Sequence, residues 1–240
     1  MNGPAKVSVY FGGAAHEIWT NSGLSVSYTG RVEVLALREG GAFRAEAPVP
    51  ARAGDVKADY NEAARSAELA ASLNSGKAPP LTRAYFRAAA EAAEAFSGLG
   101  DIQALPGRLS RELSGGQDSL ILPEVLRLLL DEHRASWEAA VDLVSRCFSL
   151  RVGEGERDAR VPLEAVAALQ PRDAGLIRAL NEKLCGRLRG LAAHRRKRPP
   201  ARRRGGPRHA LRRVLRQNNL YEGAAGRVPA RDVHPRARQV

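Results

Sequence analysis

The sequence predicts an α/β protein with strands at the N-terminus followed mostly by helices. Residues 6–11 alternate apolar side chains with others, which is typical of a half-buried strand. Residues 31–37 (RVEVLAL) lie between glycines and predict a second strand. From about residue 57 the apolar spacing changes to three or four residues, which predicts helices.

The basic charge is concentrated at the C-terminal end. The chain has 240 residues and a formal net charge of +12. Residues 186–240 contain 16 Arg and one Lys against two acidic residues, a net charge of +15, whereas residues 1–185 carry −3. We therefore expect a folded body over residues 1–190. The Arg/Pro/Gly-rich tail over residues 191–240 is expected to be disordered on its own.

Cysteine usage and hydropathy indicate the compartment. Two cysteines, Cys147 and Cys185, cannot build a disulfide framework, which favours a reducing compartment. There is no signal-peptide apolar region at the N-terminus, and no apolar run reaches the roughly 18 residues of a membrane span. The prediction is a cytoplasmic protein without membrane contact. The five histidines lack metal-ligand spacing, so no metal site is expected.

Five helices are expected in the body, over residues 57–73, 81–96, 123–133, 136–148 and 172–191. Ser136 is the expected cap of the fourth, and Cys147 near its end is expected in the core. Residues 42–55 contain Pro and Gly and predict a loop. Asp131 and Glu132 are interpreted as a solvated face. The apolar face of the first helix is expected from Tyr60, Ala63, Ala64, Ala67 and Ala71.

Residues 113–117 read LSGGQ, the letters of the signature of ATP-binding-cassette ATPases. Residues 128–132 (LLLDE) imitate the acidic strand end that follows the signature in those proteins. Such ATPases also need a phosphate cradle of the form G-x-x-x-x-G-K-[ST], and the chain contains none. Pro123 and the apolar period predict a helix rather than a strand. The ATPase interpretation is therefore disfavoured.

The stretch from 113 to 150, LSGGQDSLILPEVLRLLLDEHRASWEAAVDLVSRCFSL, resembles the α-glucan (glycogen, starch and maltodextrin) phosphorylases. That family has a segment of the form L-N-D-T-H-P-S-L-A-I-P-E-L-M-R-L-L, then D-E, then W-x-x-A. The frame that this chain shares with it consists of Leu113, Ser119, Leu120, Pro123, Glu124, Arg127, Leu128, Asp131, Glu132, Trp137 and Ala140.

Shorter pieces on both sides follow the family's order. They include VYFGG at residues 9–13, the G-K and Y-F at 76–86, VPL at 161–163 and LQPR at 169–172. Each piece is weak alone, and the shared order extends the resemblance over about residues 6–190.

The resemblance implies a partial, Rossmann-like N-terminal domain of a phosphorylase. Those enzymes cleave a terminal α-1,4-linked glucose with inorganic phosphate and release glucose 1-phosphate, using pyridoxal phosphate. The cofactor's lysine lies in a second domain of the family that this chain lacks. The chain is therefore expected to be truncated, to bind no pyridoxal phosphate alone and to be inactive by itself. α-Glucan, phosphate and a complementing chain are the partners that the resemblance implies.

The departures from the family are concentrated at its substrate site. The N-D-T-H-P segment falls on Ser114, Gly115, Gly116, Gln117 and Asp118. The T-N-H-T segment, whose His contacts the sugar, falls on residues 151–154, which include Gly153. These positions correspond to the family's substrate site, but their residues differ from those of the family. No catalytic residue is expected in this chain. A sugar site that loses its hydrogen-bonding partners loses much of its rate and discrimination.

The tail leaves two alternatives open. Its arginine runs at residues 195–198 and 202–204 attract phosphate backbones, so the chain could be a non-catalytic interaction protein with a basic nucleic-acid-binding arm. The composition also fits a reading frame shifted at the end of the family resemblance.

Overall fold

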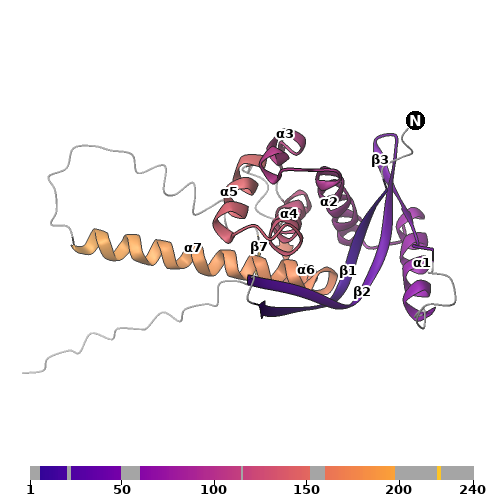
Figure 1. The fold of residues 1–240 in the computed structure, drawn as a ribbon, viewed down its shortest axis with the longest axis horizontal. Helices are drawn as coiled ribbons and strands as arrows, with labels where there is room; N and C mark the ends of the chain where they lie inside the picture. The colour runs from indigo at the N-terminus through magenta and orange to yellow at the C-terminus, as the bar shows by residue number, and fades with distance from the viewer. Residues whose placement is uncertain are drawn as a thin grey trace, which may run out of the picture.

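The computed structural model describes residues 6–20, 23–49, 60–114, 116–151, 160–197 and 221–222. These residues form an α/β fold, with an antiparallel three-stranded sheet at the N-terminus and helices after it (Figure 1). The sheet has the order β1-β2-β3, with β1 at Lys6–Thr20, β2 at Gly23–Glu39 and β3 at Ala42–Glu46. The predicted order of strands followed by helices is confirmed.

Short strands and helices make up the rest of the described chain. Two parallel pairs join β4 (Arg111–Leu113) to β5 (Phe148–Leu150) and β6 (Val161–Pro162) to β7 (Tyr221–Glu222). The helices are α1 (Tyr60–Asn74), α2 (Pro80–Phe96), η1 (Ile102–Ala104), α3 (Leu105–Arg108), η2 (Gly116–Leu120), α4 (Ile121–Arg127), η3 (Leu128–Glu132), α5 (Trp137–Cys147), α6 (Leu163–Leu169) and α7 (Pro171–Lys197).

The β1–β2 hairpin is longer than the sequence predicts. Pairing runs without a shift from Lys6 opposite Leu37 to Thr20 opposite Gly23. The strand predicted over residues 6–11 continues past Gly12 and Gly13, because these glycines have φ values of 65° and 80° and let the paired strands bend. A Cβ on Gly13 would lie 2.5 Å from Cγ of Arg31. Figure 1 shows the hairpin changing direction part-way along its length.

Strand β3 corrects the loop predicted for residues 42–55. Its Ala45 is buried against the core, and the Asn74 side chain at the end of α1 binds both backbone groups of Ala45, at 2.9 and 2.8 Å. This side chain takes the place of a neighbouring strand. Residues 50–55 lie outside the described part.

The core lies between one face of the sheet and helix α2. Val9 and Val34 are buried on that face, and the Phe11 ring meets Tyr85 of α2 edge-on at 5.2 Å. The alanines of α2 let the helix approach the sheet closely. Helix α1 lies on the other side of the hairpin from α2 in Figure 1.

Three helix predictions need correction. The buried face of α1 is Ser66, Ala70 and Leu73, whereas Ala64, Ala67 and Ala71 are exposed and the side chain of Tyr60 is not described. Alanines repeat on two overlapping stripes there, and the larger Leu73 decides which one is buried. The helix predicted over 123–133 begins at Ile121 and widens into the π-helical turn η3. Helix α7 extends to Lys197, past the predicted boundary at residue 190.

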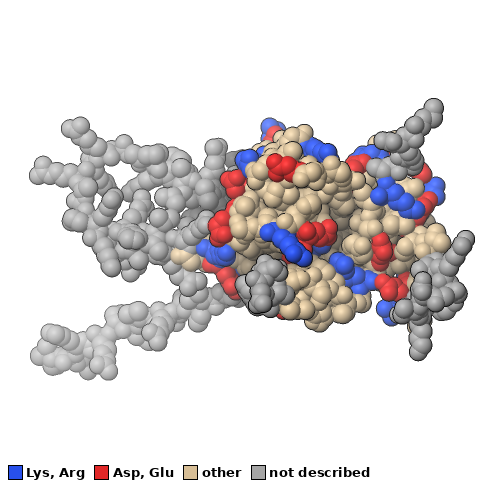
Figure 2. All heavy atoms as spheres, in the orientation of Figure 1, with Lys and Arg blue, Asp and Glu red and all other residues tan. Residues whose placement is uncertain are grey.

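Other predictions hold. The Ser136 hydroxyl accepts the Ala139 N–H and caps α5, and Cys147 is buried at the end of that helix. None of the helices in the described chain combines the length and apolar character that crossing a membrane requires. Figure 2 shows acidic and basic side chains interspersed over the visible face of the described body. Residues 198–220 and 223–240 of the predicted tail lie outside the described residues.

Candidate functional site

The predicted sugar-site positions follow directly after strand β4. Ser114 is exposed, and Gly116 begins the turn η2 with a φ of 56°, which glycine adopts without strain. Gln117 is exposed and Asp118 is half-buried in that turn. Gly115, also predicted here, lies outside the described residues.

Strand β5 brings the second predicted segment beside the first. Leu113 pairs in parallel with Leu150, and the Arg151 N–H donates to the Leu113 carbonyl at 2.9 Å. Ligand sites in α/β proteins commonly form where the carboxyl ends of parallel strands meet. The two predicted segments therefore start at one edge, although Gly153 lies outside the described residues.

The polar groups of the β4 loop, residues 114–118, bind one another. The Ser114 hydroxyl donates to the Asp118 carboxylate at 2.6 Å, and the Arg111 guanidinium lies 3.6 Å from the same carboxylate. Asp118 is thus oriented and partly satisfied within the protein. What this loop offers chemically is hydrogen bonding. Within the described ranges, no group of three or more His, Cys, Asp or Glu side chains is arranged to hold a metal ion.

The ATPase interpretation finds no support in the fold. Residues 128–132 form η3, so the predicted helix is confirmed and the acidic strand end of that family is not formed. His133, which follows η3, stacks on Phe96 with ring centroids 4.9 Å apart.

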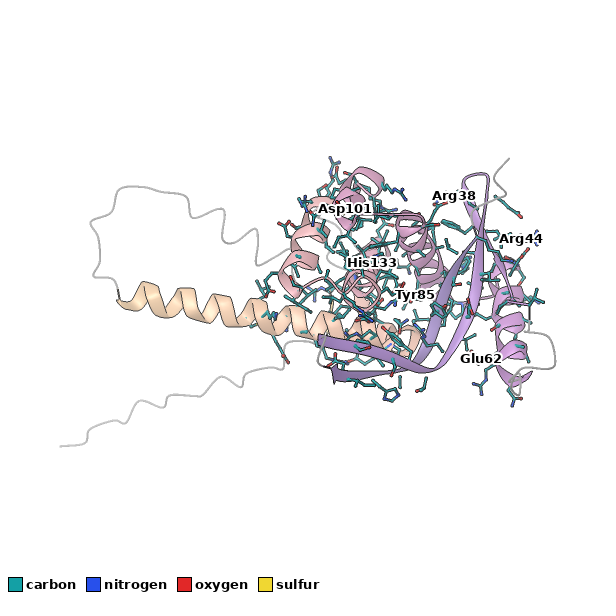
Figure 3. The ribbon with its side chains drawn as sticks, in the orientation of Figure 1. Arg38, Arg44, Glu62, Tyr85, Asp101 and His133 are labelled. Carbon is teal, nitrogen blue, oxygen red and sulfur yellow. The ribbon has the colours of Figure 1, made fainter. Side chains whose placement is uncertain are left out.

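A polar cavity of about 460 Å³ lies beside this region, between β2, α2 and β4. Arg38, labelled in Figure 3, lines it and donates to Glu94 of α2 at 2.7 Å. Arg111 also lines the cavity and binds Glu91 at 2.6 Å. Arg38 and Arg111 are thus paired with carboxylates, whereas Arg108, which also lines the cavity, binds the backbone carbonyls of Ser97 and Gly98.

A second polar cluster, which the sequence did not predict, lies inside the protein. We call Tyr85, Glu124, Arg127, Gln170 and Asp173 the buried network. All five residues are at most 3% exposed. Arg127 donates twice to Glu124, from Nε at 3.0 Å and Nη2 at 2.7 Å, and its Nη1 donates to the partly exposed Glu132 at 3.0 Å.

The same network covers the outer edge of strand β1. The Tyr85 hydroxyl lies 3.1 Å from the Tyr10 carbonyl oxygen and 3.4 Å from Glu124 Oε2. The Gln170 amide also donates to the Tyr10 carbonyl at 3.4 Å. Figure 3 shows Tyr85 where α2 meets the hairpin. Side chains thus satisfy a strand carbonyl that would otherwise need a further strand.

Asp131 corrects the predicted solvated face. Its side chain is 1% exposed and accepts two hydrogen bonds from Arg172, at 3.0 and 2.8 Å. Tyr28 of β2 also donates to Asp131, and Arg172 binds Glu17 of β1 at 2.5 Å. Burial and the bond to Asp131 raise the pKa of Tyr28, so Tyr28 stays protonated. This set of contacts joins η3, α7 and the hairpin.

Asp173 is the member of the network that lacks a donor. Neither of its carboxyl oxygens has a hydrogen-bond partner among the described residues, and the same holds for Gln170 Oε1. Burial raises the pKa of Asp173 well above its ordinary value of 3.8, and the neighbouring Glu124 raises it further. Burial disfavours the charge of Arg127, but Glu124 outweighs this and raises the pKa of Arg127.

The spacing of Glu124 and Arg127 is the signal that could have revealed the network. They lie three residues apart, on one side of a helix that is otherwise leucine-rich. Charged residues in such an apolar stretch are rarely buried without a partner. The network has no access to solvent, so its role in the described structure is to hold elements together.

Comparison with known proteins gives a weak and local similarity. The muscle forms of glycogen phosphorylase from Ovis aries and Bos taurus are each 28% identical to this chain over 90 residues. The aligned stretch is 37% of this chain and only 11% of each of those proteins. No family model matches the chain. The similarity supports a distant relationship to glycogen phosphorylase.

Replacing Arg127 by methionine tests the buried pair. The variant Arg127→Met leaves Glu124 buried without its cation, a change that typically costs about 3–5 kcal/mol of unfolding free energy. We expect a loss of this size in urea denaturation followed by circular dichroism. The control is Arg146→Met, which removes the exposed i,i+4 pair to Asp142 and should cost less than about 1 kcal/mol. Equal losses in the two variants would contradict the assignment.

Proposed function

We propose that the chain is a degenerate form of the later part of an α-glucan phosphorylase N-terminal domain, without phosphorolytic activity of its own. The local identity to muscle glycogen phosphorylase supports this relationship. On this proposal the described strands belong to a Rossmann-like domain over residues 1–190. The residues after the end of α7 at Lys197 are then a separate basic tail.

The amino acids of the β4 loop are the main support for the proposed loss of activity. Where the phosphorylases have N-D-T-H-P, this chain has Ser114, Gly115, Gly116, Gln117 and Asp118. The one carboxylate in the loop binds Ser114 and Arg111. A glucose unit bound at this edge would therefore contact none of the Asn, Asp and His side chains that the family has at these positions.

Pyridoxal phosphate, the family's cofactor, does not fit the described residues. A lysine that forms a Schiff base acts from a desolvated pocket. The side chains of Lys6 and Lys183 are 45% and 50% exposed, and Lys77 is exposed as well. We propose that the chain alone binds no pyridoxal phosphate.

α-Glucan and phosphate would then be ligands only together with a complementing chain that supplies the cofactor domain.

The two cysteines are free thiols, which agrees with a cytoplasmic location.

An assay for glucose 1-phosphate tests the proposed inactivity. We expect the purified chain, incubated with glycogen, inorganic phosphate and pyridoxal phosphate, to release none above the enzyme-free blank. Muscle glycogen phosphorylase in parallel wells is the positive control. Release that scales with the concentration of the chain would contradict the proposal.

The basic tail supports a second candidate function, binding of nucleic acid. Residues 186–240 carry a net charge of +15, whereas the body is slightly acidic. Arginine runs of this kind bind phosphate backbones without sequence preference, and the affinity falls steeply with salt.

Fluorescence anisotropy with a random DNA duplex tests the second candidate. We expect binding at 50 mM salt that weakens at least tenfold at 200 mM salt, because counterions are released on binding. A variant ending at Lys197 keeps all of α7 and should lose most of the affinity. Equal binding by both proteins, or no binding of the full chain at low salt, would exclude the tail as a nucleic-acid arm.

A further inference from the structure

The buried network contains more carboxyl groups than its one guanidinium can serve. The donors of Arg127 are directed to Glu124 and Glu132. Arg172, next to Asp173 in the chain, binds Asp131 and Glu17 instead. Asp173 is 1% exposed, and among the described residues neither of its carboxyl oxygens has a hydrogen-bond donor.

The ionisable groups that act on Asp173 come from three neighbouring elements. Helix α4 supplies Glu124 and Arg127, η3 supplies Asp131, and α2 supplies Tyr85, which lies beside the same carboxylates. Together with Asp173 these make five ionisable groups, and three of the five are carboxyls: Glu124, Asp131 and Asp173. The nearest cation is already bound to one of them. Two ionised carboxylates in contact inside a protein cost far more than one ionised and one protonated carboxyl.

A helix N-terminus opposes this effect but is too weak to reverse it. Asp173 is in the first turn of α7, where the helix dipole stabilises a negative charge. The cost of burying an unpaired carboxylate is larger than this stabilisation. The balance favours a neutral Asp173, and the added proton supplies a donor toward the neighbouring Glu124.

We propose that Asp173 and Glu124 share one proton, and that this proton is a latch that keeps the first turns of α7 docked on α4 and strand β1. When the proton is lost, Asp173 becomes an unpaired buried charge. The docked position of the helix then becomes unfavourable. Gln170, which covers the β1 edge from the residue before α7, would move with it. Because α7 continues into the arginine-rich segment, the latch links pH to the attachment of that segment to the body.

The sign of the effect follows from the raised pKa of Asp173. Between the ordinary value of 3.8 and the higher native value, the native state keeps a proton that the open state loses. The stabilisation is therefore complete below the ordinary value. It is lost as the pH rises toward the native value, with an opening constant that increases at most tenfold per pH unit for one proton.

Amide hydrogen exchange of α7 from pH 5 to pH 8, corrected for the intrinsic exchange rate, tests the latch. In the wild type we expect the opening constant of residues 174–180 to rise with pH by up to tenfold per unit, while that of α2 stays constant. Asp173→Asn keeps a neutral donor toward Glu124 and should remove the pH dependence in α7. The control Asp142→Asn changes an exposed carboxylate of α5 and should behave as the wild type.

Two outcomes would overturn the latch. One is an α7 opening constant in the wild type that does not change with pH relative to α2. The other is the same pH dependence in Asp173→Asn as in the wild type. If Asp173→Asn fails to fold, the comparison of α7 with α2 within the wild type still decides, because only α7 carries Asp173.

Discussion

The fold depends on the pairing of Arg127 with Glu124 inside the protein. This pair lies between the sheet, α2 and α7, where water cannot solvate either charge. Replacing such a pair by apolar side chains often leaves the free energy of unfolding unchanged. Removing one partner, in contrast, leaves the other as an uncompensated buried charge. The pair therefore fixes a geometry more than it adds stability. Tyr85 donates to Glu124, and Gln170 in turn donates to Tyr85.

The arrangement explains how a small antiparallel sheet ends without a further strand. The carbonyl of Tyr10 faces outward from β1, and side chains from α2 and from the start of α7 satisfy it. Asn74 does the same for Ala45 at the opposite edge, in β3. Both edges are thus closed by side chains over part of their length. The β4 loop leads through η2 directly into α4, and its Ser114 and Gln117 side chains are exposed.

The sequence predicted what depends on local patterning and missed what depends on distant partners. Alternation revealed the strand from Lys6, and Ser136 revealed the start of α5. Proline and glycine in residues 42–55 indicate a loop, although the start of this stretch pairs with β2 as β3. The burial of Asp131 is not predictable locally, because Arg172, its cation, lies 41 positions away. The family resemblance indicates the β4 loop as a candidate site. The hydrogen bond between Ser114 and Asp118 inside the loop cannot be predicted from the sequence.

The protonation state of Asp173 is the most direct measure of the buried network. The ¹³C chemical shift of its carboxyl carbon can be followed from pH 4 to pH 7 in protein labelled at aspartate. A network with one shared proton predicts that the Asp173 carboxyl still shows the shift of the protonated form at about pH 5, above the ordinary aspartate pKa of about 3.9. An Asp173 signal that shows an ionised carboxylate over the whole range would contradict the account.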